Sequence, residues 1–244
     1  MEYLPSRTER RIKRVLIALA VVALILLVFF YLRPDIRLSL GHRLGIVPGA
    51  AAEQIAGPDE ARLIVISTPV PTEYTGDRYR YEARYVLHSG SPLTLTDLRD
   101  GRTIPLPLEG TTDLTAMQVR IADDRSRLLL QSDAGAAIVD LTNSEVTPVE
   151  GDPPGTWSDD VYIRDDRCSG ASPNDQWTLC LAFGRGNSRF VLGDWELRIR
   201  PYGTGGDWTR LYRGRGLLPI VGFSSDEQSV YLYNEYGIWR LPME

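Results

Sequence analysis

The sequence predicts an all-β body that follows one apolar helix, and three observations lead to this prediction. Val15–Leu32 contains 18 consecutive residues without a charge. From Arg62 onward, short runs of strand-forming residues alternate with clusters of Gly, Pro, Asp and Asn, which is typical of short strands joined by turns. Within that region, a polar turn followed by an apolar strand recurs about every 50 residues.

The N-terminal stretch predicts a membrane anchor. Residues 1–14 form a basic tail that is too short to fold on its own. As a helix, Val15–Leu32 spans roughly 27 Å, close to the thickness of the hydrocarbon layer, and it lacks the polar stripe of a core helix. The run is longer than the apolar part of a cleaved signal peptide, and no small-residue cleavage site follows it directly. We therefore expect a retained signal anchor, a transmembrane helix that contacts lipid through Val15–Leu32.

The flanking charges predict the orientation of this helix in the cell membrane. Five basic residues precede it and three follow it, namely Arg7, Arg10, Arg11, Lys13 and Arg14 against Arg33, Arg37 and Arg43. This bias favours a cytoplasmic N-terminus, so the C-terminal domain is expected to be periplasmic or extracellular. Residues 1–47 carry a balance of +5, whereas the remainder holds 19 basic and 29 acidic residues, a balance of −10. A domain with this negative charge is a poor candidate for binding nucleic acid, because it would be repelled by the phosphate backbone.

Residues 33–61 are predicted to be a juxtamembrane segment and linker. Ile36, Leu40 and Leu44 recur at helical spacing, which suits a short interfacial helix. An extended stalk remains the alternative, because Gly41 and Gly45 weaken a helix. The β domain is then expected over residues 62–244.

The repeats narrow the fold class to a small or partial β-propeller of about four blades. Three stretches resemble one another: "IADDRSRLLL", "ASPNDQWTLC" and "FSSDEQSVYL". Their turns begin at Ala122, Ser172 and Ser224, and a weaker fourth copy places Thr75 in the equivalent position. A strand, a turn and a second strand follow each of them, and such a unit repeating near 50 residues is typical of propeller blades.

Two of these stretches resemble the WD40-like repeats of TolB-type β-propellers. They are "SPNDQWTLCLAF" and "FSSDEQSVYLYNEYGIWRL". In that family a Ser-Pro-Asp-Gly turn precedes a strand; here Asn174 and Asp175, or Asp226 and Glu227, stand where Asp-Gly is usual. The resemblance implies a fold and a habit of binding partners, and it implies no single activity.

The last predicted blade has only three strands of its own, over residues 219–223, 230–234 and 238–241. A bare outer edge would invite aggregation, and propellers often complete the last blade with a strand from the other end of the chain. We expect Ala61–Ser67 either to complete the last blade or to open the first. If it does not close the ring, the domain is an open partial propeller that another chain completes.

Two cysteines, Cys168 and Cys180, flank the predicted turn at "SPND". Outside the cytoplasm such a pair is expected to form a disulfide across a hairpin, with two buried free thiols as the alternative. In the chain-entropy model the bridge would contribute about 3 kcal/mol.

The sequence offers no catalytic, cofactor-binding or metal-ligating constellation. His42 and His88 are the only histidines, and neither stands in the context of a catalytic triad or a zinc site. "GTGG" at 203–206 is expected to be a hairpin turn, because it lies between two strands and does not precede a helix. The acidic stretch with Asp152, Asp159, Asp160, Asp165 and Asp166 lacks calcium-loop spacing, so a solvated, salt-bridged loop is favoured over a calcium site.

All five tryptophans and ten of the 12 tyrosines lie in the predicted β domain. Aromatic clusters can bind sugars or proteins, but we expect these to fill the space between blades. The sequence therefore predicts a non-catalytic, single-pass membrane protein, an accessory or scaffolding subunit that binds partner membrane-protein subunits. The alternatives are a module that binds glycan or a small ligand and, less favoured, an enzyme similar to glycoside hydrolases.

Overall fold

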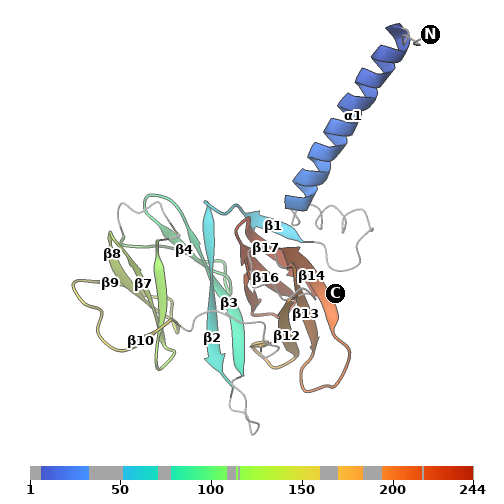
Figure 1. Ribbon diagram of the computed structural model, residues 1–244. Coiled ribbons are helices and arrows are strands. Elements are labelled where there is room, and N and C mark those ends of the chain that lie inside the picture. The colour runs from blue at the N-terminus through green and yellow to red at the C-terminus, as the bar shows by residue number, and fades with distance from the viewer. Residues whose placement is uncertain are drawn as a thin grey trace.

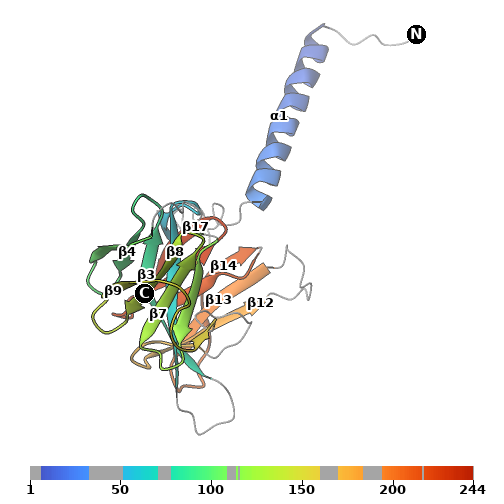
Figure 2. The same cartoon turned by 90° about the vertical axis from the view of Figure 1, so that its left-hand side faces the viewer.

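The computed structural model describes residues 7–32, 52–70, 78–108, 114, 116–159, 170–183, 194–215 and 217–243, and its body consists of β-strands. One helix, α1 (Arg7–Leu32), stands apart from this body (Figures 1 and 2). All side chains described on α1, those of residues 14–29, are exposed. Among the described residues, no helix combines the length and the apolar character needed to cross a membrane. The predicted interfacial helix and His42 lie outside the described residues.

The strands form four antiparallel units. Unit 1 contains β2 (Ala61–Pro69), β3 (Tyr79–His88), β4 (Thr94–Asp97) and β5 (Thr103–Pro105). Unit 2 contains β6 (Gln118–Ala122), β7 (Arg127–Ser132), β8 (Gly135–Asp140) and β9 (Val146–Val149), with β10 (Trp157–Ser158) paired to β6. Unit 3 contains β11 (Gly170–Ala171), β12 (Trp177–Phe183), β13 (Asp194–Pro201) and β14 (Thr209–Arg215). Unit 4 contains β15 (Ile220–Phe223), β16 (Ser229–Asn234), β17 (Gly237–Pro242) and β1 (Glu53–Ala56).

The fourth strand of unit 4 comes from the start of the β body. β1 pairs antiparallel with β17, and Glu53 lies opposite Arg240. The prediction that residues 33–61 are only linker is wrong at this point, because the β body begins at Glu53 and not at Arg62. Of the two roles expected for Ala61–Ser67, the second is confirmed, because β2 opens unit 1 by pairing with β3.

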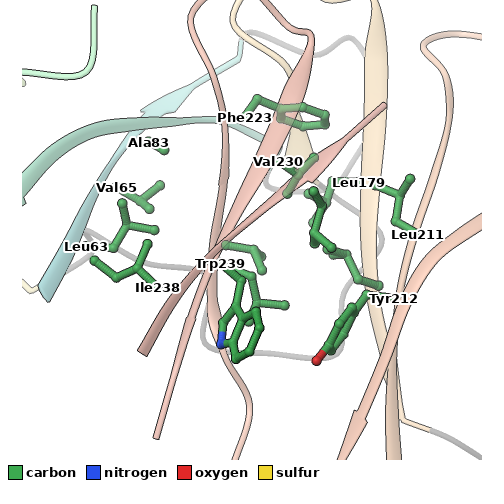
Figure 3. Packing of buried hydrophobic residues seen from close by; sticks show 14 of the residues in the cluster. Leu63, Val65, Ala83, Leu179, Leu211, Tyr212, Phe223, Val230, Ile238 and Trp239 are labelled. Atoms are coloured by element: carbon green, nitrogen blue, oxygen red, sulfur yellow. The ribbon is translucent and has the colours of Figure 1, made fainter. Parts of the chain in front are cut away.

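Unit 1 lies in the middle of the body, with unit 2 on one side and units 3 and 4 on the other (Figure 1). Its faces contribute to two hydrophobic cores. Ile64 and Leu95 pack into the core shared with unit 2. Leu63 and Val65 pack into the core shared with units 3 and 4, which Figure 3 shows around Phe223, Val230 and Trp239. A sheet that is apolar on both faces explains the nearly unbroken apolar run of β2.

A β-bulge redirects the side chains of β3. Ile64 pairs with Tyr85 and Val65 with Ala83, so Arg84 is an extra residue in the ladder. Before the bulge, Tyr81 and Ala83 belong to the core with units 3 and 4. After it, Tyr85 and Leu87 belong to the core with unit 2. The bulge therefore lets one strand supply large side chains to both cores.

The second strand of unit 1 also pairs with the first strands of units 3 and 4. β3 pairs in parallel with β11, at Tyr79 and Gly170, and with β15, at Glu82 and Phe223. These ladders join units 1, 3 and 4 into one continuous twelve-stranded sheet, and unit 2 forms a second, five-stranded sheet. In the described part of the chain, neither sheet closes on itself.

The predicted turn repeat is present in the backbone. The amides of Arg125, Asp175 and Glu227 donate to the carbonyls of Ala122, Ser172 and Ser224, respectively. The three donors have φ of 58°, 58° and 57°, the left-handed conformation. The same turn therefore connects the first two strands of units 2, 3 and 4, at the spacing of 50 and 52 residues in the sequence.

Candidate functional site

Of the two histidines weighed for catalysis, only His88 lies in the described part of the chain. His88 ends β3 and is half-buried, and burial lowers the pKa of its imidazole. "GTGG" at 203–206 joins β13 to β14, so the prediction of a hairpin turn is confirmed. Within the described ranges, no group of three or more His, Cys, Asp or Glu side chains is placed to hold a metal ion.

The acidic stretch is described only in part. Asp152 and Asp159 belong to the described residues, whereas Asp160, Asp165 and Asp166 do not. The Oδ1 atom of Asp159 accepts a hydrogen bond from Nε of Arg120 at 3.2 Å, and both side chains are exposed. This described contact is a solvated salt bridge, the kind of pairing that was favoured for this stretch.

The cysteine prediction rests on the hairpin between β11 and β12. Gly170 pairs with Leu179 and Ala171 with Thr178, so the hairpin centres on Asn174 and Asp175, within the predicted "SPND" turn. Cys180 lies on β12 and is 2% exposed. Cys168 lies outside the described residues, so the bridge from Cys168 to Cys180 stays a prediction.

Most of the tryptophans pack in the interior of the β body. Trp195 and Trp239 are 1% and 4% exposed, and Trp177 packs against the same core. Trp195 stacks on Tyr212, with ring centroids 5.6 Å apart. Trp157 and Trp208 each lie beneath a guanidinium group, from Arg127 and Arg200 respectively. The positions of Trp177, Trp195 and Trp239 agree with the expectation that aromatic residues fill space between sheets.

The strongest polar constellation is buried between units 1 and 2. Nη2 of Arg84 donates to Oδ2 of Asp97 at 2.8 Å, and the hydroxyl of Ser144 donates to the same oxygen at 2.8 Å. The phenol of Tyr85 lies 3.0 Å from that hydroxyl, and the guanidinium of Arg84 lies 5.2 Å from the Tyr85 ring centroid. Arg84, Asp97 and Ser144 are each at most 5% exposed. Because Arg84 and Ser144 both bond this carboxylate, the cluster connects unit 1 to unit 2.

A second set of polar contacts joins the repeated turns to neighbouring units. Arg125 of the unit 2 turn donates to the carbonyl oxygen of Ser67 in unit 1 at 3.1 Å. Asp175 of the unit 3 turn accepts two hydrogen bonds from Arg80 in unit 1. Glu227 of the unit 4 turn, 2% exposed, accepts from the amide of Asn174 in unit 3. Each of these three turn residues with positive φ therefore uses its side chain to hold an adjacent unit.

The equivalent turn residues also show why Ser and Asp recur there. The hydroxyls of Ser172 and Ser224 accept from the amides of Trp177 and Ser229, five residues further on in each case. The carboxylate of Asp226 accepts from the Ser224 hydroxyl and from the Gln228 amide, and these bonds lower its pKa. Such side-chain bonds to the backbone stabilise the turn locally.

The outer face of unit 3 carries a group of charges on one sheet. Glu196 accepts from Nε of Arg198 at 2.9 Å and from Nη1 of Arg210 at 3.3 Å. Burial alone raises the pKa of Glu196, but the hydrogen bonds and charges of Arg198 and Arg210 outweigh it, so the net shift is downward. Arg200 extends over the ring of Trp208, 4.4 Å from its centroid.

Sequence reasoning missed Arg84, Asp97 and the cross-unit role of the turn residues. In "YRYEARYVL", Arg84 continues the charged alternation of Arg80 and Glu82, so the sequence alone does not distinguish it from an exposed residue. The pairing with Asp97 and Ser144 has no local signal, since its members come from separate strands and turns. The described contacts hold the units together and leave the outer sheet faces available to bind other molecules.

Comparisons with models of known protein families and with curated proteins find no match to this chain.

Proposed function

We propose that this protein is a non-catalytic, single-pass membrane protein and that its β body is an accessory or scaffolding subunit of a membrane-bound assembly. One observation carries the non-catalytic part of the proposal. The buried carboxylate of Asp97 and the half-buried carboxylates of Asp175 and Glu196 are all bonded to arginine within the body. Such pairing fixes these groups in structural contacts and favours a rigid body that presents surfaces.

The anchor is supported by the sequence and by the exposure of α1. The side chains described on α1 extend to Phe29, and the uncharged stretch continues in the sequence to Leu32. Exposed Leu, Ile, Val and Phe side chains on an isolated helix favour a lipid environment over water. With the predicted orientation, the N-terminus is cytoplasmic and the β body extracytoplasmic.

The β body is proposed to be an open, four-bladed arrangement related to TolB-type propellers. Each of the four units supplies a four-stranded antiparallel blade, and β1 completes the last one. Asp175 and Glu227 stand where that family has glycine, and both have the positive φ that glycine adopts without strain. Broad sheet faces suit a body that binds other proteins.

The proposal is tested by purifying the full-length chain from its native membrane in a gentle detergent. Recovery with stoichiometric membrane-protein subunits supports the accessory role, and recovery as a single monomeric species contradicts it. A matched variant replaces Val15–Leu32 with an unrelated membrane-spanning helix. If partners persist in that variant, the β body makes the contact; if they are lost, the helix makes it.

A further inference from the structure

We propose that the outer face of unit 3 docks onto anionic phospholipid headgroups of the membrane that anchors the chain. This surface, the arginine face, comprises Glu196, Arg198, Arg200, Arg210 and Arg213. The proposal rests on the membrane anchor proposed above and adds a second contact between the protein and lipid.

Alternation along β13 places the charged side chains together on one face. Trp195, Leu197 and Ile199 are buried in the core, so Glu196, Arg198 and Arg200 lie on the opposite face of the sheet. On β14, Arg210 pairs with Arg198, and Arg213 pairs with Glu196. Directly opposite residues of an antiparallel pair share a face, so the arginine face holds four arginines and one glutamate, a balance of +3.

Arg198, Arg210 and Arg213 remain accessible on this face. Glu196 bonds both Arg198 and Arg210, whose side chains remain 40% and 41% exposed. Arg200 lies over the ring of Trp208, which is itself half-buried. A guanidinium group is planar and weakly hydrated, and it binds phosphate oxygens with two parallel hydrogen bonds. Tryptophan beside arginine is also the pairing that suits the boundary between headgroups and acyl chains.

The negative charge of the domain as a whole makes the arginine face the favoured surface for contact with an anionic membrane. Residues 48–244 carry a balance of −10, so an anionic membrane surface repels most of the body. The arginine face is opposite in sign and can approach such a surface, which would fix the orientation of the body. The tether permits it, because the residues between Leu32 and Ala52 can span at most roughly 70 Å.

The expected effect of the arginine face on membrane docking is large enough to measure. A basic residue near an anionic bilayer changes the docking equilibrium by about fivefold. A net charge of three therefore shifts the ratio of docked to undocked body by roughly 100-fold at low salt. Removing two arginines should reverse about 25-fold of that shift.

The test uses the full-length protein in nanodiscs of phosphatidylcholine alone or mixed with phosphatidylglycerol. Amide hydrogen exchange is measured by mass spectrometry over β13 and β14. The proposal expects slower exchange there in the anionic nanodiscs, and loss of this protection in high salt and in the double variant Arg198→Gln, Arg213→Gln. That variant leaves Glu196 paired with Arg210, and its denaturation midpoint checks that it folds.

The matched control is the double variant Arg120→Gln, Arg240→Gln, which removes the same charge from units 2 and 4 and should retain the protection. Equal exchange in both kinds of nanodisc overturns the proposal. Protection that arises only when other membrane proteins are present also overturns it, because the face would then bind an acidic protein. Incorporation into nanodiscs reports on the anchor separately, so a failure of the anchor and a failure of the arginine face are distinguishable.

Discussion

Arg84 and Asp97 form an ion pair that is almost completely removed from solvent, with side chains 6% and 2% exposed and an N–O distance of 2.8 Å. Arg84 is the extra residue of the bulge in β3, and Asp97 ends β4. Ser144, from the turn after β8, donates to the same carboxylate. The pair therefore fixes the bulge, and the hydrogen bond from Ser144 joins unit 2 to unit 1.

Breaking this pair from one side should be strongly destabilising. Asp97→Ala leaves a buried guanidinium without a counter-ion, a change that typically costs about 3–5 kcal/mol. Replacing both residues, as in Arg84→Met with Asp97→Leu, should cost less, because no uncompensated charge remains. Urea denaturation of the three proteins measures the difference. A double variant less stable than Asp97→Ala would contradict the role given to the ion pair.

The positive φ of Asp175 predicts that a glycine variant at this position is more stable than an alanine variant. Asp175→Ala loses the bond to Arg80 and keeps the positive φ, which costs a side chain about 1 kcal/mol or more. Asp175→Gly loses the same bond but removes that cost, so the glycine variant should be the more stable of the two by about 1 kcal/mol.

Arg80→Gln serves as the control for that comparison, because it weakens the pair without touching the turn. It should cost less than Asp175→Ala. Thermal denaturation ranks the three variants, and an alanine variant as stable as the glycine variant would show that the turn conformation relaxes.

Gly237 controls how closely β1 approaches β17. Its φ is +121°, and a Cβ atom there would lie 2.1 Å from the carbonyl oxygen of Ala56. Gly237→Ala should therefore displace β1 and accelerate amide exchange over Glu53–Ala56. Gly203 is the matched control, because its φ is +69° and a Cβ atom there would meet nothing within 4 Å. Gly203→Ala should cost only the backbone strain, about 1 kcal/mol, and leave exchange in β1 unchanged.

Glu196 predicts a pH dependence of stability. Its pKa is lowered in the folded protein, so the unfolded state binds its proton more readily. The contribution of Glu196 is fully present above its ordinary pKa of 4.5 and is lost as the pH falls through the lower value in the folded protein. Glu196→Gln should remove this contribution, of the order of 0.5–1 kcal/mol for partly exposed pairs, and flatten the profile below pH 4.5. An unchanged slope in that range would show that Arg198 and Arg210 do not favour the ionised form.

Peptide mapping without reduction is expected to recover Cys168 and Cys180 in one linked pair. Their reduction should lower the free energy of unfolding by about 3 kcal/mol. Two separate alkylated thiols under non-reducing conditions would favour the alternative of free cysteines.

The local features of the fold were predictable, and the features that depend on strand partners were not. The turns at Ala122, Ser172 and Ser224 are visible in the sequence because Ser, Asp and Asn stabilise them through bonds to nearby backbone groups. β1 escaped prediction because "EQIA" is short and mostly exposed, so it has no alternating apolar pattern. Only its ladder with β17 makes it a strand.

In the candidate sites, too, residue types were predictable from the sequence, whereas contacts that depend on strand register were not. The expectation that the chain has no catalytic triad rests on residue types alone, because the chain has two histidines, and it stays a prediction. The bulge at Arg84 could not be predicted, since an extra residue in a ladder is defined by the register with β2. The arginine face also required the register of β13 and β14, because an irregularity between Leu197 and Arg198 decides which arginine of β14 lies opposite Glu196 and which lies opposite Arg198.

The place of β1 in unit 4 has a consequence for biosynthesis. Gln54 bonds the carbonyl of Tyr236, a residue 182 positions later in the chain. At translation rates of about 5–20 residues per second, β1 leaves the ribosome roughly 10–40 s before its partner strand exists. The complete sheet of unit 4 therefore forms only after β17 has been synthesised. Until then β1 has to be kept from pairing with other strands, so the need for chaperones should be highest during this interval.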